Sequence, residues 1–481
     1  MKKILKDWTP ERLSRQVGQI GSQLDDWWHL SLDRTVRLAV TGLNQSGKTV
    51  FTTTLIHHLL HALQGSNLPA LKVADEERLL GTRIMPQPDL DIPTFSYERY
   101  IRALLAHKPT WPVPTESLSE IRLAIRFRPA GMLSRKLSTS ATLYLDIIDY
   151  PGEWLLDLPM LKHSFDSWSA FTLKLCEEEP RRTLAARWLD HLTHHLNPSD
   201  PANDEVVRQV AELYTDFLLA CKKPQVGLTF LQPGRFTIPG DLKGAPLLTF
   251  CPLPPPGADG VKAGSIREAM VKRFESYQKL VAEGFLKRHF SRFDRQIVLL
   301  DLLGALNRGP TAFADMHTSL EAILENFKRG PSSLLTRLFS PRIDRLLFAA
   351  TKADYVAANQ HQNMERLLRR LVARSANDAA FLGVEIQSQA MAALRCTRTV
   401  QRDHNGRRLS FVQGTPKGRE RETLLFPGEI PDALPEADEW GAHRFHFMEF
   451  EPRRPPDAEG PTPPHIRLDQ ALEFLLGDKL Q

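Results

Sequence analysis

The feature that most constrains the fold is a glycine-containing loop between an apolar strand and a helix. The apolar run at 36–40 leads into GLNQSGKT at 42–49, and a helix-like segment follows directly. This is the pattern G-x-x-x-x-G-K-[ST] in the context that gives it meaning, strand before and helix after. Its backbone N–H groups and the positive end of the helix dipole can bind phosphate oxygens. The stretch therefore predicts a P-loop nucleotide-binding core.

Each residue of this loop has an expected role. Lys48 is expected to reach the outer phosphates and to act in catalysis there, and the Thr49 hydroxyl is expected to bind Mg²⁺. The other nucleotide-binding residues predicted in the loop are Asn44, Gln45, Ser46, Gly47 and Val50.

Composition narrows the class of protein. The chain is 42% hydrophobic and 25% charged, as in globular proteins. Its 481 residues are too many for a single simple domain. A net charge of +5 is slight for this length and does not suggest a nucleic-acid-binding protein. The four cysteines are widely spaced, which fits a reducing cytosol. Without an 18-residue apolar run we expect no transmembrane helix, and the cysteine spacing favours a cytoplasmic location.

The predicted fold class is α/β: a Ras-like P-loop NTPase core with a mostly parallel sheet, one antiparallel edge and a large helical insertion. Residues 1–33 are expected to form an amphipathic helix that docks on the main domain or binds a membrane surface or partner. The other predicted segments are the first part of the core at 34–154, the helical insertion at 155–290, the second part of the core at 291–396, and a C-terminal hairpin and helix at 397–481.

Two alternating segments, 120–127 and 139–149, are typical of an antiparallel strand pair with one half-exposed edge strand. The second segment ends in Asp149, a candidate to hold Mg²⁺ as a Walker-B carboxylate does. Gly152 follows in a D-x-x-G pattern, and its backbone N–H is expected to meet the γ-phosphate. A second D-x-x-G begins at Asp301, so that Asp301 competes with Asp149 for the Mg²⁺ role.

The strand predicted at 343–350 runs into Thr351-Lys352-Ala353-Asp354. A carboxylate here can accept hydrogen bonds from the N1–H and N2 amine of guanine, whereas adenine offers no such donor pair. The stem of Lys352 can lie along the base plane. Further along, the backbone N–H near Leu394 could contact the guanine carbonyl. These residues predict a guanine-binding site.

The stretch 64–118 is rich in proline and is expected to be irregular apart from a helix near 97–106. A threonine in such a stretch could close over Mg²⁺ and the γ-phosphate. Thr82 and Thr94 are candidates, and an ordinary surface loop is the alternative.

The ordered set GLNQSGKT, DYPGEW and TKAD resembles the GTP-binding P-loop class. More narrowly, the chain resembles, essentially end to end, the YcjX-like (DUF463) family of bacterial stress-associated GTP-binding proteins. The resemblance implies a Ras-like core with a helical insertion, binding of GTP and GDP with Mg²⁺, and a link to stress. It also implies a protein partner, with a membrane protein as one candidate.

Two residues depart from small GTPases. Thr351 stands where the guanine motif usually begins with Asn, and Glu153 stands where a Gln usually orients water. Glu153 is a candidate catalytic residue, but its carboxylate would repel the γ-phosphate unless it is protonated or turned away. The sequence predicts a GTP-binding switch with slow Mg²⁺-dependent hydrolysis. The alternatives are an ATP-dependent P-loop enzyme and a non-catalytic nucleotide-binding adaptor.

Overall fold

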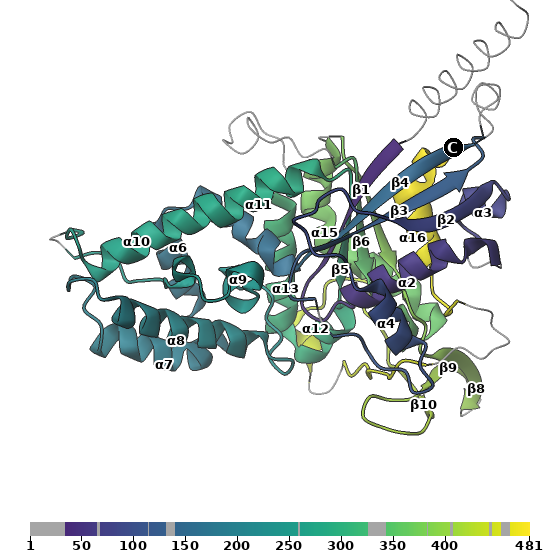
Figure 1. The fold of residues 1–481 in the computed structure, drawn as a ribbon. Helices are drawn as coiled ribbons and strands as arrows, with labels where there is room; N and C mark the ends of the chain where they lie inside the picture. The colour runs from purple at the N-terminus through teal and green to yellow at the C-terminus, as the bar shows by residue number, and fades with distance from the viewer. Residues whose placement is uncertain are drawn as a thin grey trace, which may run out of the picture.

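A computed structural model describes residues 34–64, 68–113, 115–130, 140–257, 260–325, 343–381, 383–404, 407–441, 445–453 and 462–481. The helix predicted at 1–33 lies outside these residues. The described chain is built on a seven-stranded sheet of order β2-β3-β4-β1-β5-β6-β7 (Figure 1). The strands are β1 (Arg34–Gly42), β2 (Leu79–Met85), β3 (Ser119–Phe127), β4 (Ala141–Asp149), β5 (Arg295–Leu300), β6 (Arg345–Ala350) and β7 (Glu385–Ala390).

Five neighbouring strands, β4, β1, β5, β6 and β7, run parallel, and β3 pairs antiparallel with both β2 and β4. This is the predicted α/β core with an antiparallel edge. One detail differs, because the edge strand is β2 and not a member of the predicted pair. Gly81 interrupts β2 at a register shift with φ 154°, which breaks the alternating pattern that strand prediction relies on.

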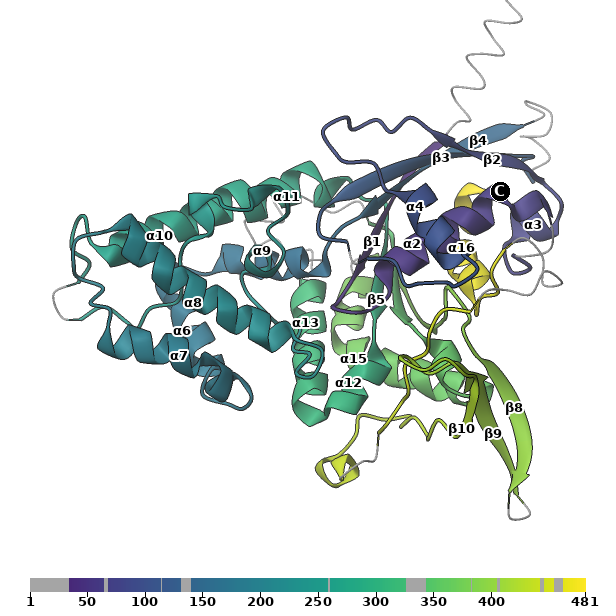
Figure 2. The same cartoon turned by 60° about the horizontal axis from the view of Figure 1, so that its bottom comes forward.

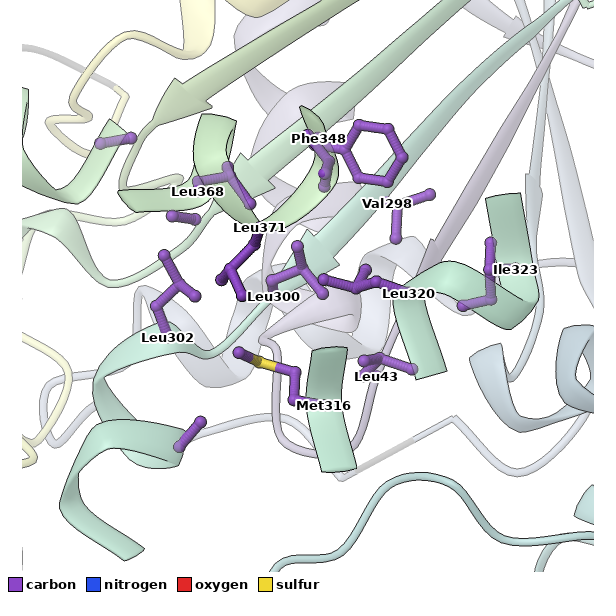
Figure 3. Close-up of a cluster of buried hydrophobic side chains, with 14 of the residues drawn as sticks. Leu43, Val298, Leu300, Leu302, Met316, Leu320, Ile323, Phe348, Leu368 and Leu371 are labelled. Atoms are coloured by element: carbon purple, nitrogen blue, oxygen red, sulfur yellow. The ribbon is translucent and has the colours of Figure 1, made fainter. Parts of the chain in front are cut away.

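Helices cover both faces of the sheet, as buried parallel strands require. On one face, α2 (Lys48–Leu60) and α16 (Leu468–Leu476) share a hydrophobic cluster with the strands. On the other face lie α12 (Leu302–Arg308), α13 (Pro310–Glu325) and α15 (His361–Phe381). Figure 3 shows the cluster on that face, in which side chains of β5 and β6 such as Val298, Leu300 and Phe348 meet Leu320 and Leu371 from the helices.

The helical insertion forms a body at one side of the sheet (Figure 2). It has a hydrophobic core of its own, which includes aromatic rings such as Trp168, Trp188, Tyr214 and Phe274. Its main helices are α6 (Phe165–Leu175), α7 (Arg181–His194), α8 (Asp204–Lys222), α9 (Gly234–Thr237), α10 (Ile266–Tyr277) and α11 (Glu283–Arg288).

After β7 the chain forms a small separate sheet of β8 (Arg398–His404), β9 (Arg407–Gly414) and β10 (Thr423–Leu425). The pairing of β8 with β9 matches the predicted hairpin. Between β1 and β3 lie α3 (Lys72–Asp75) and α4 (Tyr97–Leu104), the latter near the predicted helix. Within the residues described, no helix is both long and apolar enough to span a bilayer.

Candidate functional site

The carboxyl ends of the parallel strands meet at one edge of the sheet, where open α/β folds bind their ligands. A cavity of about 980 Å³ lies there. Its lining combines the loop after β1, the segments after β6 and β7, and a part of the helical insertion. Most of the predicted site residues line this cavity: Asn44, Gln45, Ser46, Gly47, Lys48, Thr49, Val50, Glu153, Thr351, Lys352, Asp354 and Leu394.

The loop after β1 has the close packing that its glycines allow. A Cβ atom at Gly42 would overlap the Ser46 hydroxyl and contact Leu299. Gln45 and Gly47 have positive φ angles of 62° and 77°. These left-handed residues curl the loop so that α2 begins directly at Lys48. The helix N-terminus therefore faces the cavity with its free N–H groups, an arrangement suited to phosphate.

Three hydroxyl and carboxylate side chains meet beside Lys48. The Lys48 Nζ atom lies 2.6 Å from Asp149 Oδ1, and the Thr115 hydroxyl donates to Asp149 Oδ2 at 2.8 Å. The hydroxyls of Thr49 and Thr115 are 2.9 Å apart. Hard oxygen ligands of this kind, completed by phosphate oxygens, suit Mg²⁺. Groups of three or more His, Cys, Asp or Glu able to hold a metal were not found among the described residues, and a P-loop metal site does not require one.

Thr115 was not among the candidates from sequence. Thr94 instead donates to Gln87 Oε1 at 2.9 Å, Thr82 lies on the edge strand β2, and the cavity lining includes neither of them. A signal for Thr115 was present in the predicted strand pair. Because Ser119 at the start of β3 pairs with Asp149 at the end of β4, residues just before β3 must lie near that carboxylate.

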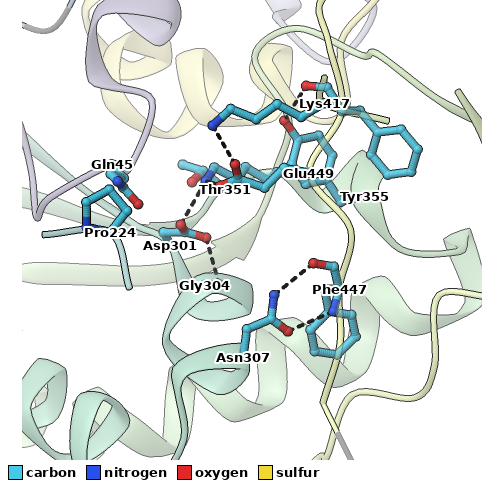
Figure 4. A network of polar contacts seen from close by, with 12 residues as sticks. Gln45, Pro224, Asp301, Gly304, Asn307, Thr351, Tyr355, Lys417, Phe447 and Glu449 are labelled. Carbon is cyan, nitrogen blue, oxygen red and sulfur yellow. Dashed lines mark hydrogen bonds and ion pairs between the residues drawn. The ribbon is translucent and has the colours of Figure 1, made fainter. Parts of the chain in front are cut away.

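Asp301, the rival to Asp149, is engaged elsewhere. Its side chain accepts the Gly304 N–H at 3.0 Å and so caps α12, and it accepts a hydrogen bond from Lys352 Nζ at 2.7 Å (Figure 4). The contacts with Thr115 and Lys48 belong to Asp149. The metal assignment proposed below therefore uses Asp149.

Asp354 lines the cavity in the turn after β6, and β1 and β5 separate β6 from β4, the strand that ends at Asp149. The Asp354 side chain is buried, and one carboxylate oxygen accepts the Cys396 N–H at 2.7 Å. Burial raises the pKa of Asp354 to about 7, although the hydrogen bond from Cys396 opposes this shift. Lys352, with a positive φ of 60°, turns the chain between β6 and this carboxylate. The predicted guanine-reading residues are thus brought together at one place.

A C-terminal segment also lines this end, and sequence reasoning did not identify it. Glu449 lies 2.7 Å from Lys417 and 3.6 Å from Lys352. The segment is held by Asn307, whose side-chain amide makes two hydrogen bonds with the backbone of Phe447 (Figure 4). No local motif marks these residues, because they reach the cavity only through the long path of the chain after β7.

The segment after β4 contributes Pro151 and Glu153 to the cavity lining, whereas the predicted site residues Asp149 and Gly152 are not part of that lining. A Cβ atom at Gly152 would overlap the Gly42 carbonyl oxygen, so only glycine lets this segment approach the loop so closely. Beside it, Glu153 Oε1 lies 2.7 Å from Lys222 Nζ, at the end of α8 of the insertion. The sequence suggested that Glu153 would avoid repelling the γ-phosphate by being protonated or turned away. The structure shows a third arrangement, in which a lysine of the insertion pairs with the carboxylate.

Comparison with known proteins agrees with this architecture. The model of the YcjX-like family, DUF463, matches residues 36–480. A protein of Escherichia coli K12 named "Ras-like GTPase YcjX" is 43% identical over 473 residues, which cover 96% of this chain and all of that protein. A protein of the same name from Shewanella oneidensis MR-1 is 40% identical over 475 residues, 94% of this chain and 96% of that protein. This chain therefore belongs to the YcjX-like family.

Proposed function

We propose that this chain binds GTP and GDP with Mg²⁺, hydrolyses GTP slowly and acts as a nucleotide-dependent switch. The observation that carries the proposal is that the Lys48 loop and Asp354 line one cavity, large enough for a nucleoside triphosphate. The printed names of the two relatives, both "Ras-like GTPase", support the same activity.

In this proposal the phosphates bind the loop after β1 and the N-terminus of α2. Thr49, Thr115 and Asp149 hold Mg²⁺, which supplies positive charge against the charge that develops on the phosphates. Lys48 is paired with Asp149 in the structure. Nucleotide binding requires Lys48 to leave that carboxylate and turn to the phosphate oxygens.

At the base end, Asp354 in its ionised form accepts the two N–H donors of guanine. An adenine in the same place would leave the buried carboxylate without them, which costs binding energy. Thr351 stands where the motif usually has Asn, and its hydroxyl donates to the Leu300 carbonyl at 3.1 Å and so links the end of β6 to β5. Leu394 contributes its backbone beside the base.

The switch in this proposal is the segment at 152–162, which lies between the cavity and the insertion. The Gly152 N–H contacts the γ-phosphate when GTP is bound, which shifts the segment. The shift is transmitted to the insertion that packs against this segment. The stress-response role, the protein partner, with a membrane protein as one candidate, and a peripheral inner-membrane location rest on the family resemblance alone. A cytoplasmic location is also favoured by the spacing of the cysteines.

The proposal is tested by measuring which nucleotides the purified chain binds and whether Lys48→Ala abolishes binding. Removing Lys48 takes away the phosphate-binding cation, so GDP and GTP affinity should fall about 100-fold or more. Lys72→Ala is the matched control, because Lys72 is exposed on α3 and does not line the cavity.

The outcomes separate the alternatives. Equal binding of ATP and GTP would support an ATP-dependent enzyme, and tight GDP without any turnover would support a non-catalytic adaptor. Unchanged affinity in Lys48→Ala would refute the phosphate site itself.

A further inference from the structure

The helical insertion reaches the nucleotide cavity through the end of α8. Its last residue, Lys222, lines the cavity, and its backbone carbonyl accepts a hydrogen bond from the Asn44 side chain at 3.0 Å. The insertion loop at 236–240 also contributes to the lining. Thus a body with its own core touches the phosphate-binding loop directly.

The Lys222 side chain turns toward Glu153 and forms an ion pair with it. The Nζ and Oε1 atoms are 2.7 Å apart, and the side chains are 18% and 9% exposed respectively. Charges this sheltered are weakly screened, so loss of one partner leaves the other strongly uncompensated. Glu153 also directly follows Gly152, the residue proposed to report the γ-phosphate.

The backbone around Glu153 is fixed against the same insertion. A Cβ atom at Gly234 would overlap the Glu153 carbonyl oxygen, and the Gly234 N–H donates to Asp157 at 2.6 Å. The Arg235 guanidinium lies over the Trp154 ring, with its Cζ atom 3.3 Å from the ring centroid. The Trp154 indole N–H donates to the Ile238 carbonyl at 3.1 Å. Lys222 and Glu153 are therefore presented to each other by a packed scaffold.

We propose that Lys222 is a positioning residue that the insertion supplies for GTP hydrolysis. Its ammonium group neutralises and orients Glu153, so that this carboxylate can hold the attacking water without repelling the γ-phosphate. The inference rests on the proposed GTPase function and adds to it a residue outside the core motifs. It makes the insertion an internal counterpart of the external proteins that complete the sites of other GTPases.

A charge role and a tethering role make different predictions. If Lys222 only fastened the insertion to the core, its loss would affect GDP and GTP alike. If it neutralises Glu153, its loss must penalise GTP more than GDP, because GTP alone carries the γ-phosphate. Removing the negative charge as well, by Glu153→Gln, must then cancel the penalty.

The test uses the full chain with Lys222→Met, which keeps the aliphatic stem, Glu153→Gln and the double variant. Affinities for GDP and a non-hydrolysable GTP analogue are measured in Mg²⁺, together with single-turnover GTP hydrolysis. We expect Lys222→Met to weaken the GTP analogue about tenfold or more relative to GDP and to slow hydrolysis about 100-fold. The double variant should return the GTP-to-GDP affinity ratio to that of Glu153→Gln alone.

Two further variants serve as controls. Lys222→Arg keeps the charge and should keep the wild-type ratio, whereas Lys223→Ala removes a neighbouring exposed charge outside the cavity lining and should change nothing. An unchanged ratio in Lys222→Met, or a penalty that Glu153→Gln does not relieve, would overturn this inference while leaving the GTPase proposal intact. A wild-type chain that binds no guanine nucleotide would instead refute the proposed function, and the inference with it.

Discussion

The two ends of the proposed nucleotide cavity are built in different ways. The base end is built around one buried carboxylate, Asp354, in the turn that follows β6, and one of its oxygens accepts the Cys396 N–H. The phosphate end is a set of ion pairs and hydrogen bonds between separate segments, in which Lys48 contacts Asp149 and Lys222 contacts Glu153. The base end suits selection of a ligand, and the phosphate end suits a change of state.

This difference has a physical basis. A buried carboxylate held by the sheet cannot relax when the wrong base enters, so it discriminates by the cost of an unpaired acceptor. The ion pair of Lys48 with Asp149 can exchange partners when a nucleotide binds. Lys48 then pairs with phosphate oxygens in place of the carboxylate, and Asp149 pairs with the proposed Mg²⁺ in place of the ammonium group. We therefore expect variants at the base end to alter specificity and variants at the phosphate end to alter turnover.

The largest effect is expected at the base end. Asp354→Asn should lower GDP affinity about 100-fold or more, because two charge-assisted hydrogen bonds are lost, and should shift preference toward xanthine nucleotides. Competition binding with GDP, ADP and XDP measures this. An Asp354→Asn variant that still prefers GDP would show that the base is read elsewhere.

At the phosphate end, Thr115→Ala should slow GTP hydrolysis about tenfold to 100-fold with GDP affinity nearly unchanged. The reason is that Thr115 bridges Thr49 and Asp149 at the proposed Mg²⁺ position. Single-turnover rates over a Mg²⁺ titration measure this, with Thr94→Ala as the control outside the cavity lining. Equal effects of the two substitutions would remove Thr115 from the proposed Mg²⁺ site.

The raised pKa of Asp354, about 7, predicts a pH dependence at the base end. Guanine requires the ionised carboxylate, so GDP affinity should fall about tenfold per pH unit below that value and level off above it. The raised pKa also affects the stability of the free protein, because folding favours the protonated carboxyl group. This group therefore lowers stability as the pH rises from 3.8, the ordinary pKa, to about 7. Titration calorimetry should detect proton release on GDP binding, and Asp354→Asn should abolish that release.

The smallest effect is expected where the two ends are connected. The Trp111 indole donates to the Phe450 carbonyl at 3.2 Å, joining the segment before Thr115 to the C-terminal segment. Trp111→Phe removes one neutral hydrogen bond, so GDP affinity should change about fivefold or less. A loss as large as that of Asp354→Asn would mean that the two ends are not separable.

The residues that could be predicted from sequence are those whose signal is local. The loop at Lys48, the strand ending at Asp149 and the segment at Asp354 are local patterns whose flanking strands fix their place at one sheet edge. The edge strand β2 was missed because Gly81 breaks its alternation. Lys222 could not be found, since only the fold of the insertion brings the end of α8 to Glu153, and no local spacing records that contact.

The central claim is that one cavity joins a triphosphate-binding loop to a purine-selecting carboxylate. The most direct measurement is competition of GTP and ATP for the full chain in Mg²⁺, monitored with a fluorescent guanine nucleotide. The account predicts that GTP competes about 100-fold or more strongly than ATP, because only guanine supplies the donor pair for Asp354. Equal competition by ATP would contradict it.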